Sequence, residues 1–368
     1  MKPDATRPRR DQLLEMIQEL TLIQGPSGSE EAVRERIKEW VTPYAQKVSI
    51  DPLGNLLVRA KGSAPEDGSA GDGRPAREHA QEAAGKQRRI MLIAHMDEIG
   101  VIATHVDENG FVRIRPIGGV SPTMLLGQRV RFVNGTVGAV GIEKIEGPKD
   151  ISFEKLYVDI GAESREEALS MVQIGDAAGL WRPVELAGPH RILGKALDDR
   201  VGCAVAVQTL VELSQQPSPH TVDVVFSVQE EVGLRGAGPA AYGLNPDLAL
   251  AIDVTATGDT PKAETMDVSL GKGVAVKVMD RSLLTHARVK ELLVETAKAE
   301  NIPYQMEILT FGGTDAGAVH LTRAGIPSGV VSLPTRYLHT PTEMVDLRDL
   351  EAAVALLVAV LRRETIEL

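Results

Sequence analysis

Two hydrophobic patterns divide this 368-residue chain, and they change abruptly near residues 100 and 187. On both sides of the block between these two positions, short continuous apolar runs such as 90–94 and 248–252 alternate with longer segments whose apolar residues recur every three or four positions. Continuous runs are typical of strands buried on both faces, whereas the longer spacing is typical of helices. The alternation predicts an α/β domain with a mostly parallel sheet and helices on both faces.

The block in the middle has the pattern of an antiparallel all-β unit. Its short stretches alternate between apolar and polar residues, and segments 107–110 and 134–135 have the composition of hairpin turns. We therefore expect residues 1–100 and 188–368 to form one discontinuous α/β domain. Residues 101–187 should form a small barrel-like domain inserted into it.

One segment of low complexity lies before this block. Residues 61–89 are rich in Gly, Ala, Ser, Glu and Asp, and nearly free of large apolar side chains. Such a segment cannot bury enough apolar surface to offset the entropy lost on ordering. We expect a mobile surface loop there, and we assign no catalytic role to His79 within it.

Composition limits the location of the protein and its partners. The single cysteine, Cys203, cannot form an intramolecular disulfide, and its place in the apolar run of a predicted helix indicates a buried thiol. The first residues lack the apolar core of a secretory signal, and no stretch reaches the roughly 18 apolar residues that a membrane span needs. We therefore expect a cytoplasmic protein with no membrane partner. A net charge of −11 without any basic block argues against nucleic acid as a partner.

Residues of the types that bind metals follow several predicted strands. His95 and Asp97 come directly after the run 90–94. In an extended chain, residues two positions apart face the same way, and a ligating imidazole commonly donates its other N–H to a carboxylate. His95 is thus a candidate ligand and Asp97 the residue that orients it. An ordinary loop histidine beside a solvated acid would give the same local pattern.

Acidic residues occupy two further junctions. Asp198 precedes a predicted helix, where it could cap that helix or give one oxygen to each of two metal ions. Glu230 and Glu231 follow the apolar strand 221–228, and burying such a pair costs on the order of several kcal/mol unless cations compensate. Adjacent side chains diverge, so one can bind metal while the other faces the substrate. An exposed acidic pair that caps the next helix is the alternative.

Asp253, directly after the run 248–252, and His339 complete the set of candidates. Two histidines, two aspartates and two glutamates then lie at strand ends, and this mixture of nitrogen and oxygen ligands suits Zn²⁺, Co²⁺ or Mn²⁺. Two such ions about 3.5–4 Å apart would generate a hydroxide and polarise a carbonyl group. The sequence therefore predicts a hydrolytic centre with two metal ions.

Six motifs, in order along the chain, resemble those of the M42 family of metallo-aminopeptidases, which includes glutamyl and leucyl aminopeptidases and the tetrahedral TET peptidases. The motifs are AHMDEIG, KALDDRVG, QEEVGLRGA, AIDVTATGDTP, FGGTDAGAVH and PTRYLHTPTEMVDLRDLE. The resemblance runs from about residue 13 to the C-terminal helix, with residues 61–89 as an insertion outside it. Thr340 stands where many members have serine.

The resemblance implies a set of ligands for two divalent ions, which are zinc, cobalt or manganese. One ion would be held by His95, Asp198 and Asp253. The other would be held by Asp198, Glu231 and His339, so that Asp198 bridges the two ions.

The resemblance also implies the remaining roles in the site and the assembly. Glu230 would be the general base, Asp97 would orient His95, and a cis peptide would join Asp198 to Asp199. The expected reaction is removal of the N-terminal residue from peptide substrates. The inserted domain resembles the dimerisation domain of the family, and we expect a homo-oligomer in which dimers assemble into a dodecamer.

Two competing functions remain to be weighed. Paired carboxylates would also suit a glycosidase, but Glu230 and Glu231 diverge, histidine ligands have no purpose there, and aromatic residues are only 3% of the chain. A scaffold protein with a vestigial site would not need a competent residue at every implied position. Segments 259–272, 279–281 and 311–313 are expected to line the substrate pocket, but they do not reveal the preferred N-terminal residue.

Overall fold

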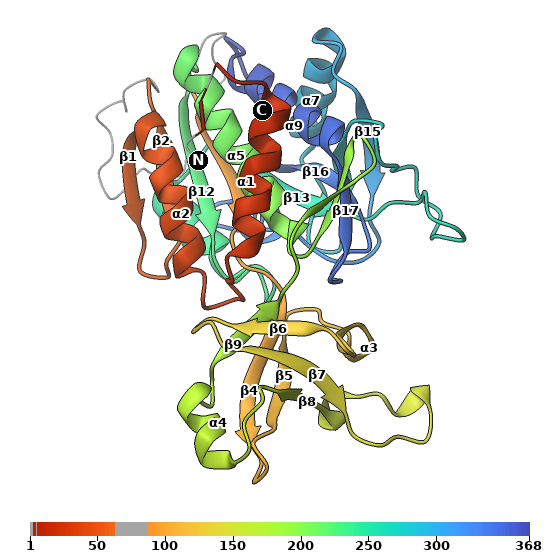
Figure 1. The fold of residues 1–368 in the computed structure, drawn as a ribbon. Coiled ribbons are helices and arrows are strands. Elements are labelled where there is room, and N and C mark those ends of the chain that lie inside the picture. Colours follow the sequence, from red (N-terminus) through yellow and green to blue (C-terminus); the bar gives the residue numbers. More distant parts are fainter. Residues whose placement is uncertain (1–2, 5, 63–86) are drawn as a thin grey trace.

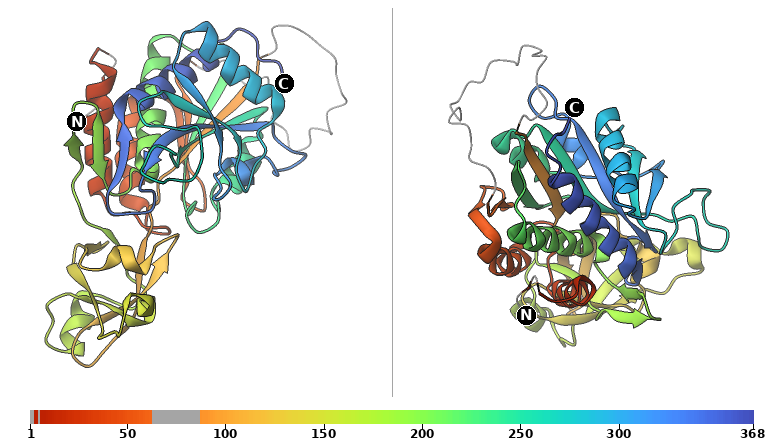
Figure 2. Two further views of the ribbon diagram at one scale, coloured as in Figure 1. Left: turned by 90° about the vertical axis from the view of Figure 1, so that its right-hand side faces the viewer. Right: turned by 90° about the horizontal axis from the view of Figure 1, so that it is seen from above.

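The computed structural model of this chain describes residues 3–4, 6–62 and 87–368. Residues 63–86, which make up most of the predicted loop and include His79, lie outside the described residues. The chain forms two bodies: a large sheet covered by helices and, below it in Figure 1, a small barrel. The side view in Figure 2 shows the same separation.

The described residues contribute eleven strands to the large sheet. Nine of them, in spatial order, are β1 (Ala45–Ile50), β2 (Leu56–Ala60), β12 (Thr221–Ser227), β3 (Arg89–His95), β13 (Leu248–Thr255), β16 (Ser328–Arg336), β17 (Glu343–Asp346), β11 (Arg191–Gly194) and β10 (Glu185–Ala187). The other two lie beside this path: β14 (Val274–Met279) pairs with β16, and β15 (Tyr304–Ile308) pairs with β14. The centre, from β12 through β3 and β13 to β16, is parallel. The strands on either side of this centre pair antiparallel, except that β15 pairs parallel with β14. The prediction of a mostly parallel sheet therefore holds for the centre and for the β14–β15 pair, and the sheet as a whole is mixed.

Helices cover both faces of this sheet because its central strands are apolar on both sides. Ile90, Leu92 and Ala94 of β3 share a core with one group of helices: α1 (Arg9–Leu22), α2 (Glu31–Val41), α5 (Leu197–Gln215), α7 (Ala287–Ala299) and α9 (Leu347–Leu361). Met91 and Ile93 pack against α6 (Ala237–Leu244) and α8 (Ala316–Val319) on the other face. Figure 2 shows α1, α5 and α9 side by side. Among the described residues, none of the helices combines the length and hydropathy that crossing a bilayer requires.

The second body is a closed barrel with a core of its own. Its strands, in order around the barrel, are β4 (Gly100–Val106), β5 (Val112–Ile117), β8 (Leu156–Asp159), β7 (Val137–Ile142), β6 (Arg129–Phe132) and β9 (Ala177–Leu180), with α3 (Pro122–Leu125) and α4 (Arg165–Met171) outside. Gly110 and Gly135, at the two predicted hairpin turns, have φ angles of 90° and 98°, which only glycine adopts without strain. The strand β10, which the sequence analysis placed in the insertion, instead pairs with β11 in the large sheet. The inserted unit therefore ends near β9.

The two bodies meet at a buried cluster of charges. The chain enters the barrel between β3 and β4, and Glu98 lies in this connection. Its carboxylate accepts hydrogen bonds from Lys195 Nζ at 2.7 and 2.8 Å and from the backbone N–H of Gly25 at 3.1 Å, and Arg200 Nη2 lies 3.5 Å away. All three charged side chains are buried. Removing Glu98 would leave two buried cations without their counter-charge, so this carboxylate holds together the segments at the entry to the barrel.

Candidate metal centre

The carboxyl ends of the parallel strands face the barrel, because β3 runs directly into β4 and its neighbours point the same way (Figure 1). His95 is the last residue of β3, Ser227 lies beside it at the end of β12, and Asp253 lies near the end of β13. His95 Nε2 is 3.8 Å from Asp253 Oδ1. The carbonyl of His95 accepts the thiol of Cys203 at 3.1 Å, and this cysteine is fully buried in α5 as predicted.

Asp198 at the start of α5 lies between two histidines. Its Oδ1 is 3.0 Å from His95 Nε2, and its Oδ2 is 3.3 Å from His339 Nε2. The same nitrogen of His339 lies 3.3 Å from Glu231 Oε2. A cis peptide joins Asp198 to Asp199, as the family resemblance implied. One carboxylate therefore faces two imidazoles that come from distant parts of the chain.

The residues proposed as ligands form one cluster. Ligand atoms of His95, Asp198 and Glu231 lie within 4.8 Å of one another, and so do those of His95, Asp199 and Asp253. With the contacts of the second histidine, all five ligands predicted from the sequence come together at one place. Asp199 is not among the ligands predicted from the sequence. Its Oδ2 accepts the backbone N–H of His95 at 3.3 Å, so it also helps to hold that residue in place.

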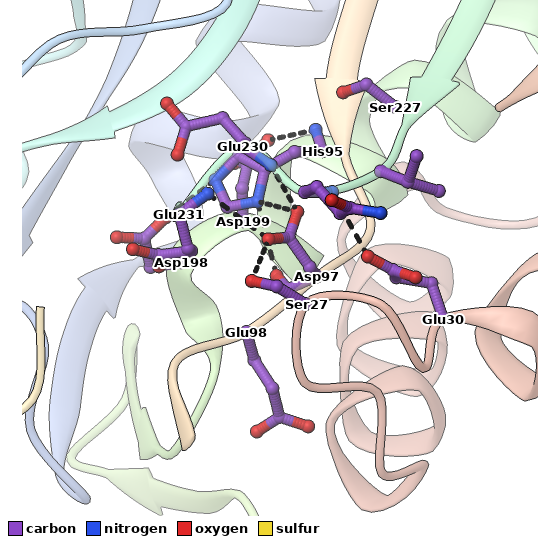
Figure 3. A network of polar contacts seen from close by, with 12 residues as sticks. Ser27, Glu30, His95, Asp97, Glu98, Asp198, Asp199, Ser227, Glu230 and Glu231 are labelled. Atoms are coloured by element: carbon purple, nitrogen blue, oxygen red, sulfur yellow. Dashed lines mark hydrogen bonds and ion pairs between the residues drawn. The ribbon is translucent and has the colours of Figure 1, made fainter. Parts of the chain in front are cut away.

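Asp97 connects His95 to the turn that carries the two glutamates (Figure 3). Its carbonyl oxygen lies 3.2 Å and its Oδ1 3.4 Å from Nδ1 of His95. The carboxylate also accepts the backbone N–H groups of Glu230 at 3.0 Å and Glu231 at 3.2 Å, and the hydroxyl of Ser27 at 2.6 Å. Asp97 therefore positions both His95 and the turn that carries the two glutamates. The sequence predicted only its contact with His95.

The side chains of Glu230 and Glu231 diverge, as expected for adjacent residues in an extended turn. Figure 3 shows the Glu231 carboxylate beside Asp198 and the Glu230 carboxylate pointing away from that pair. The side chain of Glu231 is 4% exposed, and Glu230 as a whole is 9% exposed. Within the described part of the chain, the Glu230 carboxylate makes no hydrogen bond. It is therefore free to exchange a proton with a bound molecule.

Burial dominates the electrostatics of the cluster. It raises the pKa of Asp253 to about 8, against the opposing effect of His95. It also raises the pKa of Glu231 well above its usual range, helped by the charge of Asp198, and the pKa of Glu230 is likewise raised by burial. These carboxylates cannot all ionise in a dry site without a compensating positive charge.

The donor set fits divalent cations. Within the described residues, Glu231 Oε1 is buried without a hydrogen-bond partner, and an orphaned buried carboxylate oxygen of this kind calls for a ligand. The surrounding donors are imidazole nitrogens and carboxylate oxygens, which suit zinc, cobalt or manganese. His95, Asp198, Asp253, Glu231 and His339 could hold two such ions, with Asp198 between them.

Two buried acids near the cluster were not predicted as site residues. Glu343 is 2% exposed and accepts the backbone N–H groups of His339 and Asp198. Asp315 accepts the hydroxyl of Ser227, and its Oδ1 has no hydrogen-bond partner in the part of the chain that the structure describes. Both acids lie in motifs quoted above, but no local pattern distinguishes them from solvated acids. Only the tertiary fold brings them to the site.

Comparison with known proteins identifies the family of this chain. The family model of M42 glutamyl aminopeptidases matches residues 79–356. A putative aminopeptidase of Acetivibrio thermocellus is 46% identical over 349 residues, which cover 95% of this chain and 98% of that protein.

Solved structures give the same result. An aminopeptidase from the archaeon Desulfurococcus kamchatkensis is 38% identical, with a TM-score of 0.87 over 97% of this chain and 96% of its own. The TET1 peptidase of Pyrococcus horikoshii, described as able to assemble into a tetrahedron or a large octahedral shell, is 31% identical, with a TM-score of 0.81 over 95% of this chain and 99% of its own. Since the family model covers more than half of the chain and these relatives match nearly all of it, this protein belongs to the M42 family and is an aminopeptidase.

Proposed function

We propose that this aminopeptidase removes the N-terminal residue of peptides with two divalent metal ions and with Glu230 as the general base. The position of Asp198 carries the proposal, because its two oxygens face two different histidines at 3.0 and 3.3 Å. A carboxylate in that position can bridge two ions. His95 and Asp253 would complete one set of ligands, and Glu231 and His339 the other.

When bound, zinc, cobalt or manganese ions supply Lewis acidity, which lowers the pKa of a water molecule and polarises the scissile carbonyl. The protein supplies the groups that move the proton. Glu230 takes a proton from the attacking water and gives it to the departing amine. The hydrogen bond from the Glu230 backbone to Asp97 fixes the start of this side chain, so the carboxylate is aimed before substrate binds.

The excess of carboxylates in the cluster supports cleavage at the N-terminal end of the peptide substrate. A peptide enters with a free α-ammonium group, and this cation is attracted to a buried site rich in acids. An internal peptide bond offers no such charge. The proposal therefore accounts for hydrolysis at the N-terminus alone.

Neighbouring substitutions test the separate roles of the two glutamates. Glu230→Gln should keep both metal ions but lose activity by several orders of magnitude, more than the roughly 10²–10⁴-fold typical of acid–base catalysis alone. Glu231→Gln should lose metal as well as activity. Elemental analysis and hydrolysis of a panel of aminoacyl-p-nitroanilides measure both quantities. Turnover like that of the wild type in Glu230→Gln would end the proposed mechanism.

A second variant tests the bridge. Asp198→Ala removes an oxygen from each proposed ligand set, so the bound metal should fall below two ions per chain. Two tightly bound ions in this variant would contradict a bridging Asp198. Parallel reconstitution with zinc, cobalt and manganese identifies which ion supports turnover.

We further propose that the barrel is a dimerisation domain and that dimers assemble into a dodecamer. The TET1 peptidase that resembles this chain over nearly its whole length is described as forming large closed shells, which supports a homo-oligomer. Light scattering on the purified protein measures the mass directly. A monomer at micromolar concentration would contradict this proposal and leave the site unaffected.

A further inference from the structure

A cleft of about 360 Å³ lies where the barrel meets the edge of the large sheet. On the barrel side it is lined by Arg129 of β6 and by Arg182, which follows β9. On the sheet side it is lined by Glu185 of β10 and by Pro341 and Thr342, which precede β17. The cleft therefore combines two positive side chains with the segment that leads out of the metal centre.

The two arginines outnumber the acids among the described residues that line this cleft. Within the described residues, neither Arg129 nor Arg182 forms an ion pair, and Glu185 is the one acid in the lining. The guanidinium of Arg129 lies 5.0 Å from the centroid of the Trp181 ring, and that of Arg131 lies 5.3 Å from the same centroid. Two cations held at one ring repel each other, and a bound anion would relieve that repulsion. This wall is positive in a chain whose net charge is −11.

The cleft begins close to the proposed ligand His339. Pro341 is two residues further along the chain, and two residues span at most about 7.6 Å between Cα atoms. The His339 side chain is 38% exposed, and its Nδ1 lies 3.2 Å from the carbonyl oxygen of Gly119 in the barrel. The half-exposed ring of His339 and the cleft therefore both lie at the junction between the two bodies.

A peptide substrate brings a carboxylate to this region. Its N-terminal residue occupies the metal centre, so the rest of the chain must lead away from it. Each further residue extends the peptide by about 3.4 Å, so the terminal carboxylate of a tripeptide or tetrapeptide can reach beyond His339. Arginine binds carboxylates through paired, charge-assisted hydrogen bonds, and two arginines face the cleft there.

We propose that Arg129 and Arg182 form a subsite that binds the carboxylate at the downstream end of a short peptide substrate. This inference rests on the proposed aminopeptidase mechanism and adds a preference to it. Short peptides with a free C-terminal carboxylate are better substrates than the corresponding amides. A substrate that ends at the first leaving group, such as a p-nitroanilide, makes no use of the subsite.

Three tripeptides and one reference substrate test the subsite. All begin with the residue that the wild-type enzyme cleaves best as a p-nitroanilide. The tripeptides are X-Ala-Ala with a free carboxylate, X-Ala-Ala amide, and X-Ala-Glu amide, in which the negative charge comes from a side chain. We expect the wild type to favour the free acid over its amide by about tenfold or more in kcat/KM, mainly through KM. The third peptide shows whether a side-chain carboxylate can replace the terminal one.

The double variant Arg129→Gln/Arg182→Gln should remove most of this difference. The ratio of kcat/KM for the free acid to that for the p-nitroanilide should fall about tenfold, while the amide keeps its ratio. Lys149→Gln, an exposed lysine of the barrel away from the cleft, should leave all ratios unchanged.

Equal hydrolysis of acid and amide by the wild type would overturn the subsite. So would equal losses on both peptides in the double variant, which would be the result if the cleft were an interface between subunits. Failure of the aminopeptidase proposal is a separate result, because the metal-loaded wild type would then cleave none of the p-nitroanilides.

Discussion

The carboxylate of Glu343 accepts the backbone N–H of His339 at 2.9 Å, and its other oxygen accepts the backbone N–H of Asp198 at 3.1 Å. Glu343 begins β17, Asp198 is the second residue of α5, and His339 lies in the loop after β16. One buried side chain thus fixes the distance between a proposed bridging ligand and a proposed terminal ligand. It does so through their backbones, so the ligand side chains themselves remain free to bind metal.

Glu343→Gln should therefore weaken the metal centre without removing a ligand. The amide group would place an N–H against one of the two backbone N–H groups, so one of the two segments would lose its partner. We expect a decrease in activity or metal affinity of about 10- to 100-fold, the usual cost of losing a residue that supports a ligand. Metal titration and kcat/KM on an aminoacyl-p-nitroanilide measure the effect. Glu300→Gln, at an exposed position outside the segments expected to line the substrate pocket, is the control and should behave as the wild type.

Asp97→Asn should lower kcat more than it lowers metal content. In the wild type, each carboxylate oxygen of Asp97 accepts one of the backbone N–H groups of Glu230 and Glu231. The asparagine keeps one acceptor oxygen, but its amide nitrogen cannot accept a hydrogen bond, so one of these two bonds is lost. The proposed general base would then be less well aimed. Ser27→Ala removes only the hydroxyl that donates to Asp97, so its effect should be much smaller. Equal effects of the two variants would show that the contacts with the turn are unimportant.

Removal of metal should destabilise the fold as well as abolish hydrolysis. The cluster holds buried carboxylates whose repulsion a cation relieves, and a ligand present at 100 times its dissociation constant stabilises the folded state by about 2.7 kcal/mol. Chelation should therefore lower the thermal midpoint, and added zinc, cobalt or manganese should restore it. Scanning calorimetry with and without chelator measures the shift. An unchanged midpoint in protein shown to be free of metal would contradict the assignment.

Gly119→Ala should disturb the second ligand set selectively. A Cβ atom at this position would lie 2.4 Å from Nδ1 of His339, so the imidazole would have to move. We expect about one ion per chain to be lost at limiting metal concentration while the other is retained. Gly147→Ala, where a Cβ meets nothing within 4 Å, is the matched barrel control. Full occupancy of both sites in Gly119→Ala would show that the ring has another position that still binds metal.

The ion pair between Asp259 and Arg336 should make stability depend on pH in the acid range. Burial acts against ionisation, but hydrogen bonds from Arg336 at 2.7 and 2.8 Å lower the pKa of Asp259 from 3.8 to about 2. The pair therefore stabilises the fold above about pH 4, and this contribution disappears as the pH falls through about 2. Asp259→Asn should lower the thermal midpoint at pH 7, and its difference from the wild type should shrink below pH 3. Asp267→Asn, an exposed acid of the same loop, should show no such trend.

Local patterns were enough to predict the elements that bear the site. The run 90–94 is apolar at every position, and it became a central strand with His95 at its end. The five ligand candidates were predicted from their places at strand or helix ends, and the family resemblance supplied their assignment to two ions. Parallel strands bring their carboxyl ends to one edge. Their convergence is thus a consequence of topology that the alternation of elements already indicates.

The supporting residues could not be predicted in the same way. Glu343 accepts from Asp198 and Asp315 accepts from Ser227, and both partners are distant in the sequence. An isolated acid in a polar segment looks the same whether it is buried or solvated. The mixed character of the sheet was missed for a related reason. The pairing of an edge strand such as β10 depends on where the chain returns from the barrel. A strand of three residues is too short for its apolar pattern to indicate that partner.

The barrel is joined to the sheet domain by two adjacent crossings of the chain, and its Gly119 carbonyl lies against the ring of His339. This contact ties the position of the barrel to the position of one proposed ligand. A change in the orientation of the barrel would therefore alter the space available to the imidazole of His339.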